Sequence, residues 1–328
     1  MGQLVDGKWT ADWQVPRSKG GAFQRGASGI RDWITADGSS GFAAEPGRYL
    51  LYVSYACPWA HRALLFRALK GLSHAIDVSV VDWHMTQEGW HFSDRDGAVP
   101  DPISGHAFLR DVYTASDPTY SGRVTVPVLW DKKTNRIVNN ESAEIIRMLN
   151  DAFAAHAKND VDFYPAALRG DIDAINDVIY DTVNNGVYKC GFAGSQDAYD
   201  AAFDALFETL DSLEERLGRQ RYLVGARLTE ADLRLFPTLI RFDAVYVTHF
   251  KCNRQRIVDY PNLSNYLREL YQHPGVAETV NLHHIKWHYY HSHTSINPLG
   301  IVPKGPDLDF SAPHDRDRFP VATLAQAS

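Results

Sequence analysis

The order of strand and helix patterns between residues 48 and 149 constrains the fold of this chain more than any other feature. A β-rich run at 48–54 is followed by apolar residues at helical spacing over 59–69 and by a second β-rich run at 76–81. A strand, a helix and a strand in this order form a βαβ unit, whose strands are parallel because a helix connects them. These patterns therefore predict the start of an α/β domain.

Two more β-rich runs and a second helical pattern complete this part of the sequence. The runs at 124–130 and 136–138 flank a turn and predict a hairpin, and the pattern over 143–149 predicts a helix. The resulting order is that of a thioredoxin-like domain, which we place at residues 46–155. Residues 82–122 form a loop-like insertion rich in His, Asp, Gly and Pro, and loops of this length usually carry function.

The second half of the chain shows helical patterns and no strand run of comparable quality, so it predicts an all-helical domain at 165–280. Its longest helical patterns cover 168–184, 199–217 and 229–245. Thr229, followed three residues later by Asp232, predicts that one helix begins with a capping box. Residues 1–45 predict an irregular arm and residues 281–328 a C-terminal tail. The predicted fold class is α/β followed by all-α.

Composition and charge exclude several function classes. The 328 residues carry 40 acidic side chains against 33 Lys and Arg, a formal net charge of -7 without a basic cluster, so we expect no nucleic acid partner. The apolar stretches are shorter than the roughly 20 residues that a membrane-spanning helix requires, so we expect no membrane partner. Residues 1–8 lack the basic segment and the apolar run of a targeting signal, and we expect the protein in the cytoplasm.

Cys57 lies where the first predicted strand ends and the first helix begins. Free backbone N–H groups and the positive end of the helix dipole favour a thiolate at such a position, and Pro58 suits the first helical turn because it has no N–H. Ala60 occupies the position of the second cysteine in a dithiol redox motif, so an external thiol must resolve any mixed disulfide. The alternative is a buried, unreactive cysteine, which is how we interpret Cys190 and Cys252.

Pro127 interrupts a strand pattern, and a proline there normally marks an edge strand or a special peptide bond. In thioredoxin-like folds this proline is cis. A cis bond would turn the backbone N–H and C=O of Val126 outward, so that they could pair with a peptide-like ligand. The alternative is an ordinary proline of an edge strand.

Glu141 and Ser142 stand at the start of the last helix of the thioredoxin-like domain. N–H groups and a hydroxyl at a helix start bind a carboxylate, and the Glu141 carboxylate can hold an ammonium group. A ligand with a thiol, a peptide bond and an amino-acid head group would therefore suit Cys57, Val126 and this pair, and glutathione is such a ligand. The alternative is a capping box in which Asn140 or Ser142 only starts the helix.

Histidines in the tail could suggest a metal site, since His284 and His288 lie one helical turn apart. No accompanying Cys or HExxH pattern supports such a site. We therefore expect no metal, and we prefer a tail that packs beside the active site. The histidines concerned are His283, His284, His288, His291 and His293.

Several segments resemble the glutathionyl-hydroquinone reductases, the Xi class of the glutathione transferases. They read YACPWAHR at 55–62, SGRVTVPVLWD at 121–131, NESAEIIR at 140–147, DTVNNGVYK at 181–189, YVTHFKC at 246–252 and SINP at 295–298. The likeness covers nearly the whole chain, and its motifs are long.

This resemblance implies a thioredoxin-like N-terminal domain followed by a helical glutathione transferase C-terminal domain, with glutathione as co-substrate and a homodimer as the assembly. It implies reduction of glutathionyl-hydroquinones through a mixed disulfide between Cys57 and glutathione. It also implies that Trp90 and Arg123 contact glutathione, with Arg110 as a further candidate for the glycine carboxylate. Three tyrosines would line the aromatic pocket, Tyr188 and Tyr289 as catalytic residues and Tyr246 as a pocket residue.

Two rival functions remain open at this point. An Omega-like thioltransferase or dehydroascorbate reductase would share Cys57, Val126, Glu141 and Ser142, and would differ in the tyrosines and the insertion. A non-catalytic binding module with a transferase-like fold is the other, although such a module has no need of a cysteine at a helix start.

Overall fold

The computed structural model describes residues 2–11 and 14–320, so residues 321–328 of the predicted tail lie outside the described part. The chain divides into two compact units. Unit 1 consists of Met1–Gln14, Ala27–Val161 and Glu278–Val302, and unit 2 consists of Val15–Gly26, Asp162–Ala277 and Pro303–Ser328. The predicted arm and the predicted tail are therefore both shared between the two units.

Unit 1 is built on a four-stranded mixed sheet in the order β4-β3-β5-β6. The inner strand β3 (Tyr49–Val53) is parallel to β4 (Ile76–Val80) and antiparallel to β5 (Val128–Asp131), which pairs with β6 (Arg136–Asn139). All five residues of β3 are buried, as expected for an inner strand of apolar and aromatic residues. The predicted thioredoxin-like order of strands and helices is confirmed.

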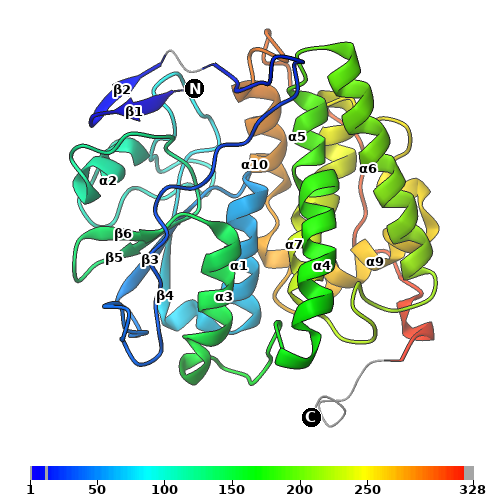
Figure 1. The fold of residues 1–328 in the computed structure, drawn as a ribbon, viewed down its shortest axis with the longest axis horizontal. Coiled ribbons are helices and arrows are strands. Elements are labelled where there is room, and N and C mark those ends of the chain that lie inside the picture. The colour runs from blue at the N-terminus through cyan, green and yellow to red at the C-terminus, as the bar shows by residue number, and fades with distance from the viewer. Residues whose placement is uncertain (1, 12–13, 321–328) are drawn as a thin grey trace. The chain divides into compact units, whose positions relative to one another are not determined.

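Two helices of unit 1 begin at the positions that matter for the site. α1 (Pro58–Leu69) and α3 (Ser142–Asp151) pack against each other beside the sheet (Figure 1). Each begins one residue before the predicted helix. Pro58 is the first residue of α1, where its missing N–H costs no hydrogen bond.

The arm and the insertion hold more regular structure than the sequence predicts. β1 (Gln3–Val5) and β2 (Lys8–Thr10) form an antiparallel hairpin, and α2 (Leu109–Ser116) lies within the insertion. Leu4 and Gly122 exchange two backbone hydrogen bonds of 2.9 Å, which hold the hairpin on the insertion. Strands of three residues are too short for a periodic pattern to reveal them.

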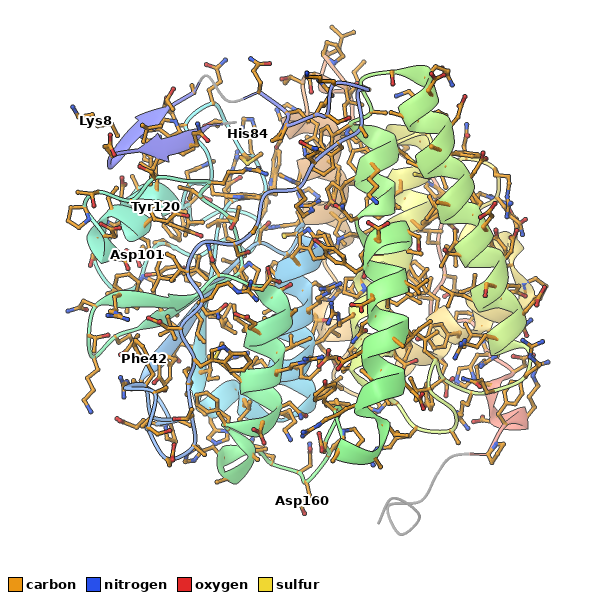
Figure 2. The ribbon with its side chains drawn as sticks, viewed as in Figure 1. Lys8, Phe42, His84, Asp101, Tyr120 and Asp160 are labelled. Carbon is orange, nitrogen blue, oxygen red and sulfur yellow. The ribbon has the colours of Figure 1, made fainter. Side chains whose placement is uncertain are left out.

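A buried carboxylate ties the insertion to the sheet. Asp101, which Figure 2 labels, is 5% exposed and accepts a hydrogen bond of 2.7 Å from the hydroxyl of Tyr52 in β3. It also accepts the backbone N–H groups of Ile103, Ser104 and His106. These donors satisfy a charge that would otherwise be costly to bury, so the insertion has a defined attachment to the core.

Unit 2 contains the helices of the second half. They are α4 (Arg169–Ile179), α5 (Gly186–Gly191), α6 (Gln196–Leu217), α7 (Glu230–Arg241), α8 (Val247–His249) and α9 (Pro261–Gln272). α7 is buried along its whole length and packs against α4 and α9 (Figure 1). The predicted capping box is confirmed, because the Thr229 N–H donates to the Asp232 carboxylate over 2.8 Å at the start of α7.

Two of the predicted long helices end differently from the expectation. The patterns over 168–184 and 229–245 continue past α4 and α7 into π-helical turns at Tyr180–Asn184 and Phe242–Tyr246. Apolar spacing cannot separate the two helix types, because it continues through both. Among the described residues, no helix combines the length and the apolar character needed to cross a membrane.

The tail divides between the units. Its part within Glu278–Val302 belongs to unit 1 and holds α10 (Leu282–Trp287) and a π-helical turn at His288–Ser292. The part from Pro303 onward belongs to unit 2. Short 3-10 turns lie at Leu72–His74, Ala154–His156, Ala166–Leu168, Ile257–Asp259, Ala277–Thr279 and Arg316–Arg318.

Candidate active site

Cys57 is the N-cap residue of α1, with extended backbone angles of φ -76° and ψ 120°. Its carbonyl oxygen accepts the N–H of His61 over 3.0 Å, so the helix begins directly after the cysteine. The Cys57 side chain is half-buried, and its thiol makes no capping bond to α1. The thiol therefore lies at the positive end of the helix dipole, where a thiolate is favoured.

The structure brings Cys57 together with the residue before Pro127. The Cys57 sulfur donates to the backbone oxygen of Val126 over 3.5 Å. The Val126–Pro127 peptide bond is cis, as the sequence predicts. A thiol and a peptide backbone group thus stand side by side, as a peptide-like thiol ligand requires.

Glu141 is the N-cap of α3, and one of its carboxylate oxygens accepts the N–H of Ala143 over 3.1 Å. The other oxygen accepts the Ser28 hydroxyl over 2.9 Å. The cap residue is therefore Glu141 itself, and not Asn140 or Ser142. A carboxylate has lone pairs beyond these two bonds and can still accept from an ammonium group. Ser142 is buried as the first residue of α3.

Trp90 of the insertion stacks on His288 of the tail, with ring centroids 4.7 Å apart and planes 21° apart. His288 is held by a 2.9 Å contact between its Nδ1 and the Trp83 oxygen. Tyr289, the next residue, is 1% exposed and lies edge-on to His293 at 5.3 Å. Trp90 thus packs on the tail residue that directly precedes Tyr289. In the sequence, only the family resemblance linked Trp90 with Tyr289.

The unit 1 segment Glu278–Val302, which includes His288 and Tyr289, also contacts residues that precede and follow Cys57 in the sequence. Two residues before Cys57, the Tyr55 ring lies edge-on to the His284 ring at 5.5 Å. Four residues after it, His61 Nε2 lies 2.7 Å from the Thr279 hydroxyl. Residues of the segment Glu278–Val302 thus contact sequence neighbours of Cys57 on either side, within unit 1.

The two arginines expected to contact glutathione, Arg110 and Arg123, differ in their surroundings. Arg110 forms an ion pair of 2.6 Å with the Glu88 carboxylate and also donates to the Glu88 backbone oxygen over 2.7 Å. Its guanidinium lies 4.1 Å from the Phe108 ring centroid, so Arg110 is occupied within the insertion. Arg123 is half-buried, three residues before Val126 on the segment that leads to the cis proline.

Unit 2 brings together the other two tyrosines. The rings of Tyr188 and Tyr246 lie 6.2 Å apart, and Phe250 packs against both at 5.4 Å. Tyr246 is fully buried, whereas Tyr188 is half-buried. The Arg25 guanidinium lies 4.6 Å from the centre of the Tyr188 ring. Sequence reasoning missed Arg25 because nothing in an irregular arm indicates which helix it will contact.

The other two cysteines are buried. Burial raises the pKa of the Cys252 thiol well above its usual value, and the neighbouring Cys190 raises it further. A thiol with a raised pKa holds little thiolate near neutral pH. Cys252 therefore has the environment of a structural thiol, in contrast to half-buried Cys57 at its helix start.

The tail histidines take part in packing. His284 Nε2 lies 2.5 Å from the backbone oxygen of Asp96, and the His291 ring packs edge-on against His84 of the insertion at 4.8 Å. Burial lowers the pKa of His84, and the neighbouring His291 and His91 lower it further. Within residues 2–11 and 14–320, no group of three or more His, Cys, Asp or Glu side chains is arranged to hold a metal ion.

Comparison with known protein families finds two matches. The family model for the glutathione S-transferase N-terminal domain matches residues 56–152, and the model for the C-terminal domain matches residues 196–269. The two matched ranges lie in the thioredoxin-like part and the helical part of the chain.

Curated relatives match over almost the full length. Glutathionyl-hydroquinone reductase YqjG of Escherichia coli (strain K12) is 57% identical over 324 residues, which cover 97% of this chain and 99% of the relative. Glutathionyl-hydroquinone reductase PcpF of Sphingobium chlorophenolicum is 56% identical, covering 93% of this chain and 96% of the relative.

Solved structures agree with these relatives. A Xi class glutathione transferase from Natrialba magadii superposes with a TM-score of 0.93 at 49% identity, covering 98% of each chain. The glutathione-bound structure of YqjG superposes with a TM-score of 0.90 at 55% identity, covering 97% of this chain and all of the other.

Proposed function

Because this chain belongs to the glutathionyl-hydroquinone reductases, the Xi class of the glutathione transferases, we propose that it reduces glutathionyl-hydroquinones to hydroquinones with glutathione as co-substrate. One observation carries this proposal most directly. The Cys57 thiol stands at the start of α1 and contacts the backbone oxygen of Val126 beside the cis proline. A nucleophilic sulfur and a backbone pairing site for a peptide-like thiol are therefore adjacent.

In the first step the Cys57 thiolate attacks the sulfur of the glutathionyl group. A disulfide bond forms between Cys57 and glutathione, the bond from sulfur to the ring carbon breaks, and the ring carbon takes up a proton. The first product is the hydroquinone. Thioethers resist such attack, so hydroxyl groups that hold the phenol oxygens must favour a keto-like tautomer with a weaker carbon–sulfur bond.

In the second step a second glutathione thiolate attacks the mixed disulfide. Oxidised glutathione leaves, and Cys57 is released as a thiolate. Ala60 is fully buried at the position of a resolving cysteine, so the external thiol is required. The sequence of two half-reactions predicts ping-pong kinetics.

The remaining site residues receive roles from their chemistry and from the family likeness. Val126 pairs with the peptide backbone of glutathione, Glu141 holds its ammonium group and Ser142 its carboxylate. Trp90 and Arg123 contact glutathione as well. Arg110 is a weaker candidate because Glu88 already neutralises it.

Three tyrosines handle the aromatic ring in this proposal. Tyr188 and Tyr289 act as proton-handling residues, and Tyr246 lines the pocket. Tyr188 is half-buried and Tyr246 fully buried, so Tyr188 is the more exposed residue of the pair in unit 2. The likeness to known family members further suggests a homodimer in the cytoplasm, with neither nucleic acid nor membrane as a partner.

The test combines a variant with a comparison of substrates. Cys57→Ala should abolish turnover of a glutathionyl-hydroquinone, and mass spectrometry should find the glutathione adduct on the wild-type chain at Cys57 only. Cys190→Ala is the matched control and should retain both activity and adduct. Substantial reductase activity in Cys57→Ala would refute the mechanism.

Relative rates separate the rival functions. A much higher kcat/KM for a glutathionyl-hydroquinone than for a small mixed disulfide or dehydroascorbate supports the proposal. The reverse order would indicate an Omega-like thioltransferase. A chain that formed no adduct and turned over none of these compounds would be a binding module.

A further inference from the structure

Residues Val15–Gly26 of the arm belong to unit 2 and are fastened to the segment after α5. Arg17 Nε donates to the Phe192 backbone oxygen over 2.9 Å, and the Gly194 N–H donates to the Gly21 oxygen over 2.8 Å. The Phe23 and Phe192 rings pack at 5.6 Å. The arm therefore has a defined course along this part of the helical unit, although its sequence predicts no regular structure.

This course places Arg25 on the face of Tyr188. The guanidinium carbon lies 4.6 Å from the centre of the Tyr188 ring. Arg25 Nε donates to the Asn185 side-chain oxygen over 2.7 Å, and Asn185 is 6% exposed. Asn185 precedes Tyr188 by three residues, about one helical turn, so one anchor fixes the guanidinium and the ring together.

A cation over the face of an aromatic ring attracts the electrons of the ring. For a tyrosine this strengthens the hydroxyl as a hydrogen-bond donor and stabilises negative charge on its oxygen. The other cation beside Tyr188 on its own helix, Lys189, is neutralised by an ion pair of 2.5 Å with Asp181. Tyr246 and Phe250 present uncharged rings. Arg25 thus places a cation in direct contact with the Tyr188 ring face.

We propose that Arg25 is a positioning residue that acts through Tyr188, holding its ring and strengthening its hydroxyl as a donor to a phenol oxygen of the hydroquinone. This inference rests on the proposed function, since it assigns Arg25 to the cleavage of the aromatic thioether. It assigns Arg25 no part in the exchange between Cys57 and a disulfide, because that exchange needs no proton delivered to a ring.

The test is a double-mutant cycle on Arg25 and Tyr188. Arg25→Met removes the charge and keeps an unbranched side chain, and it should lower kcat on a glutathionyl-hydroquinone about tenfold, the size of a well-placed cation–π contact. KM for glutathione should change little. In a Tyr188→Phe background the same substitution should have almost no further effect, because residues that act through one another are not additive. Arg25→Lys should recover part of the rate.

Arg17→Met is the matched control, because it removes a guanidinium from the same segment that bonds Phe192 instead of Tyr188. Its kcat should stay within about twofold of wild type, because Arg17 is an exposed residue whose bond reaches the Phe192 backbone. Equal losses in Arg17→Met and Arg25→Met would show that anchoring of the arm matters and would overturn the inference. If Arg25→Met and Tyr188→Phe lowered kcat by independent factors that multiply in the double variant, the inference would also be overturned. The same holds if Tyr188→Phe left kcat unchanged. A wild-type protein inactive on glutathionyl-hydroquinones would instead refute the proposed function.

Discussion

The ring of His288 lies flat against the ring of Trp90, with centroids 4.7 Å apart and planes 21° apart. Trp90 comes from the insertion of unit 1 and His288 from its tail segment, 198 positions later in the sequence. A residue proposed to contact glutathione is thus supported by the segment that carries Tyr289. We therefore expect glutathione binding and the placement of Tyr289 to share this packing contact.

His288→Ala should raise KM for glutathione about fivefold, because aromatic pairs contribute about 0.5–1.5 kcal/mol beyond area burial. His288→Phe is the matched variant, since it keeps a ring against Trp90 and loses the bond to the Trp83 oxygen. Its KM should lie close to that of wild type. If both variants raised KM for glutathione equally, the bond from His288 to the Trp83 oxygen would be the contact that supports Trp90. The ring contact would then not be the cause. Steady-state kinetics with glutathione as the varied substrate decides between them.

Tyr289→Phe should lower kcat on a glutathionyl-hydroquinone about a hundredfold, the lower range for loss of a general acid or base. Tyr289 is 1% exposed. Phe fits the same buried space because the substitution removes only the hydroxyl group. Tyr290→Phe removes the hydroxyl of the adjacent buried tyrosine and should leave kcat nearly unchanged. An unaltered rate in Tyr289→Phe would exclude a proton-handling role for this residue.

Arg316→Met should destabilise the helical unit by about 3 kcal/mol, as expected when a buried charged partner is removed from its acceptors. The buried guanidinium donates to the backbone oxygens of Leu217, Gln220 and Arg221 over 2.5–2.7 Å, at the end of α6. The control is Arg318→Met, because Arg318 is exposed and its pairing contributes less than about 1 kcal/mol. Urea unfolding followed by circular dichroism measures both, and equal midpoints would contradict the assigned role of Arg316.

His249 should make stability depend on pH. Burial and, to a smaller extent, the charge of Lys251 together lower its pKa to about 4 in the folded chain. The unfolded chain, with a His pKa of about 6.5, therefore takes up a proton between these values while the folded chain does not. Above pH about 6.5 this residue adds no pH dependence, and stability falls by up to about 3 kcal/mol as pH decreases to 4.

His249→Gln should flatten this part of the pH profile of the free energy of unfolding. His74 is exposed, so His74→Gln should leave the profile as it is in wild type. An unchanged slope between pH 4 and 6.5 in His249→Gln would mean that other groups cause the acid sensitivity of the protein.

Local sequence signals determined a large part of the fold and the centre of the site. The strand and helix order of unit 1, the start of α1 directly after Cys57, the cis bond before Pro127 and the Thr229 capping box were all predictable. Each strand, helix start and cap depends on residues within a few positions of one another, and the cis bond was expected from the thioredoxin-like order that these elements form. Hydrogen bonding and apolar spacing over such distances follow from the chain itself.

Only the tertiary structure decided how distant segments complete the surroundings of the site. The first part of the tail joins unit 1, where His284 packs against Tyr55, and residues Val15–Gly26 of the arm join unit 2, where Arg25 covers Tyr188. Such pairs lie far apart in the sequence, and many pairings of irregular segments satisfy the same composition. Which one forms depends on the shape and charge of surfaces that exist only after the helices and the sheet have folded, and no local pattern encodes them.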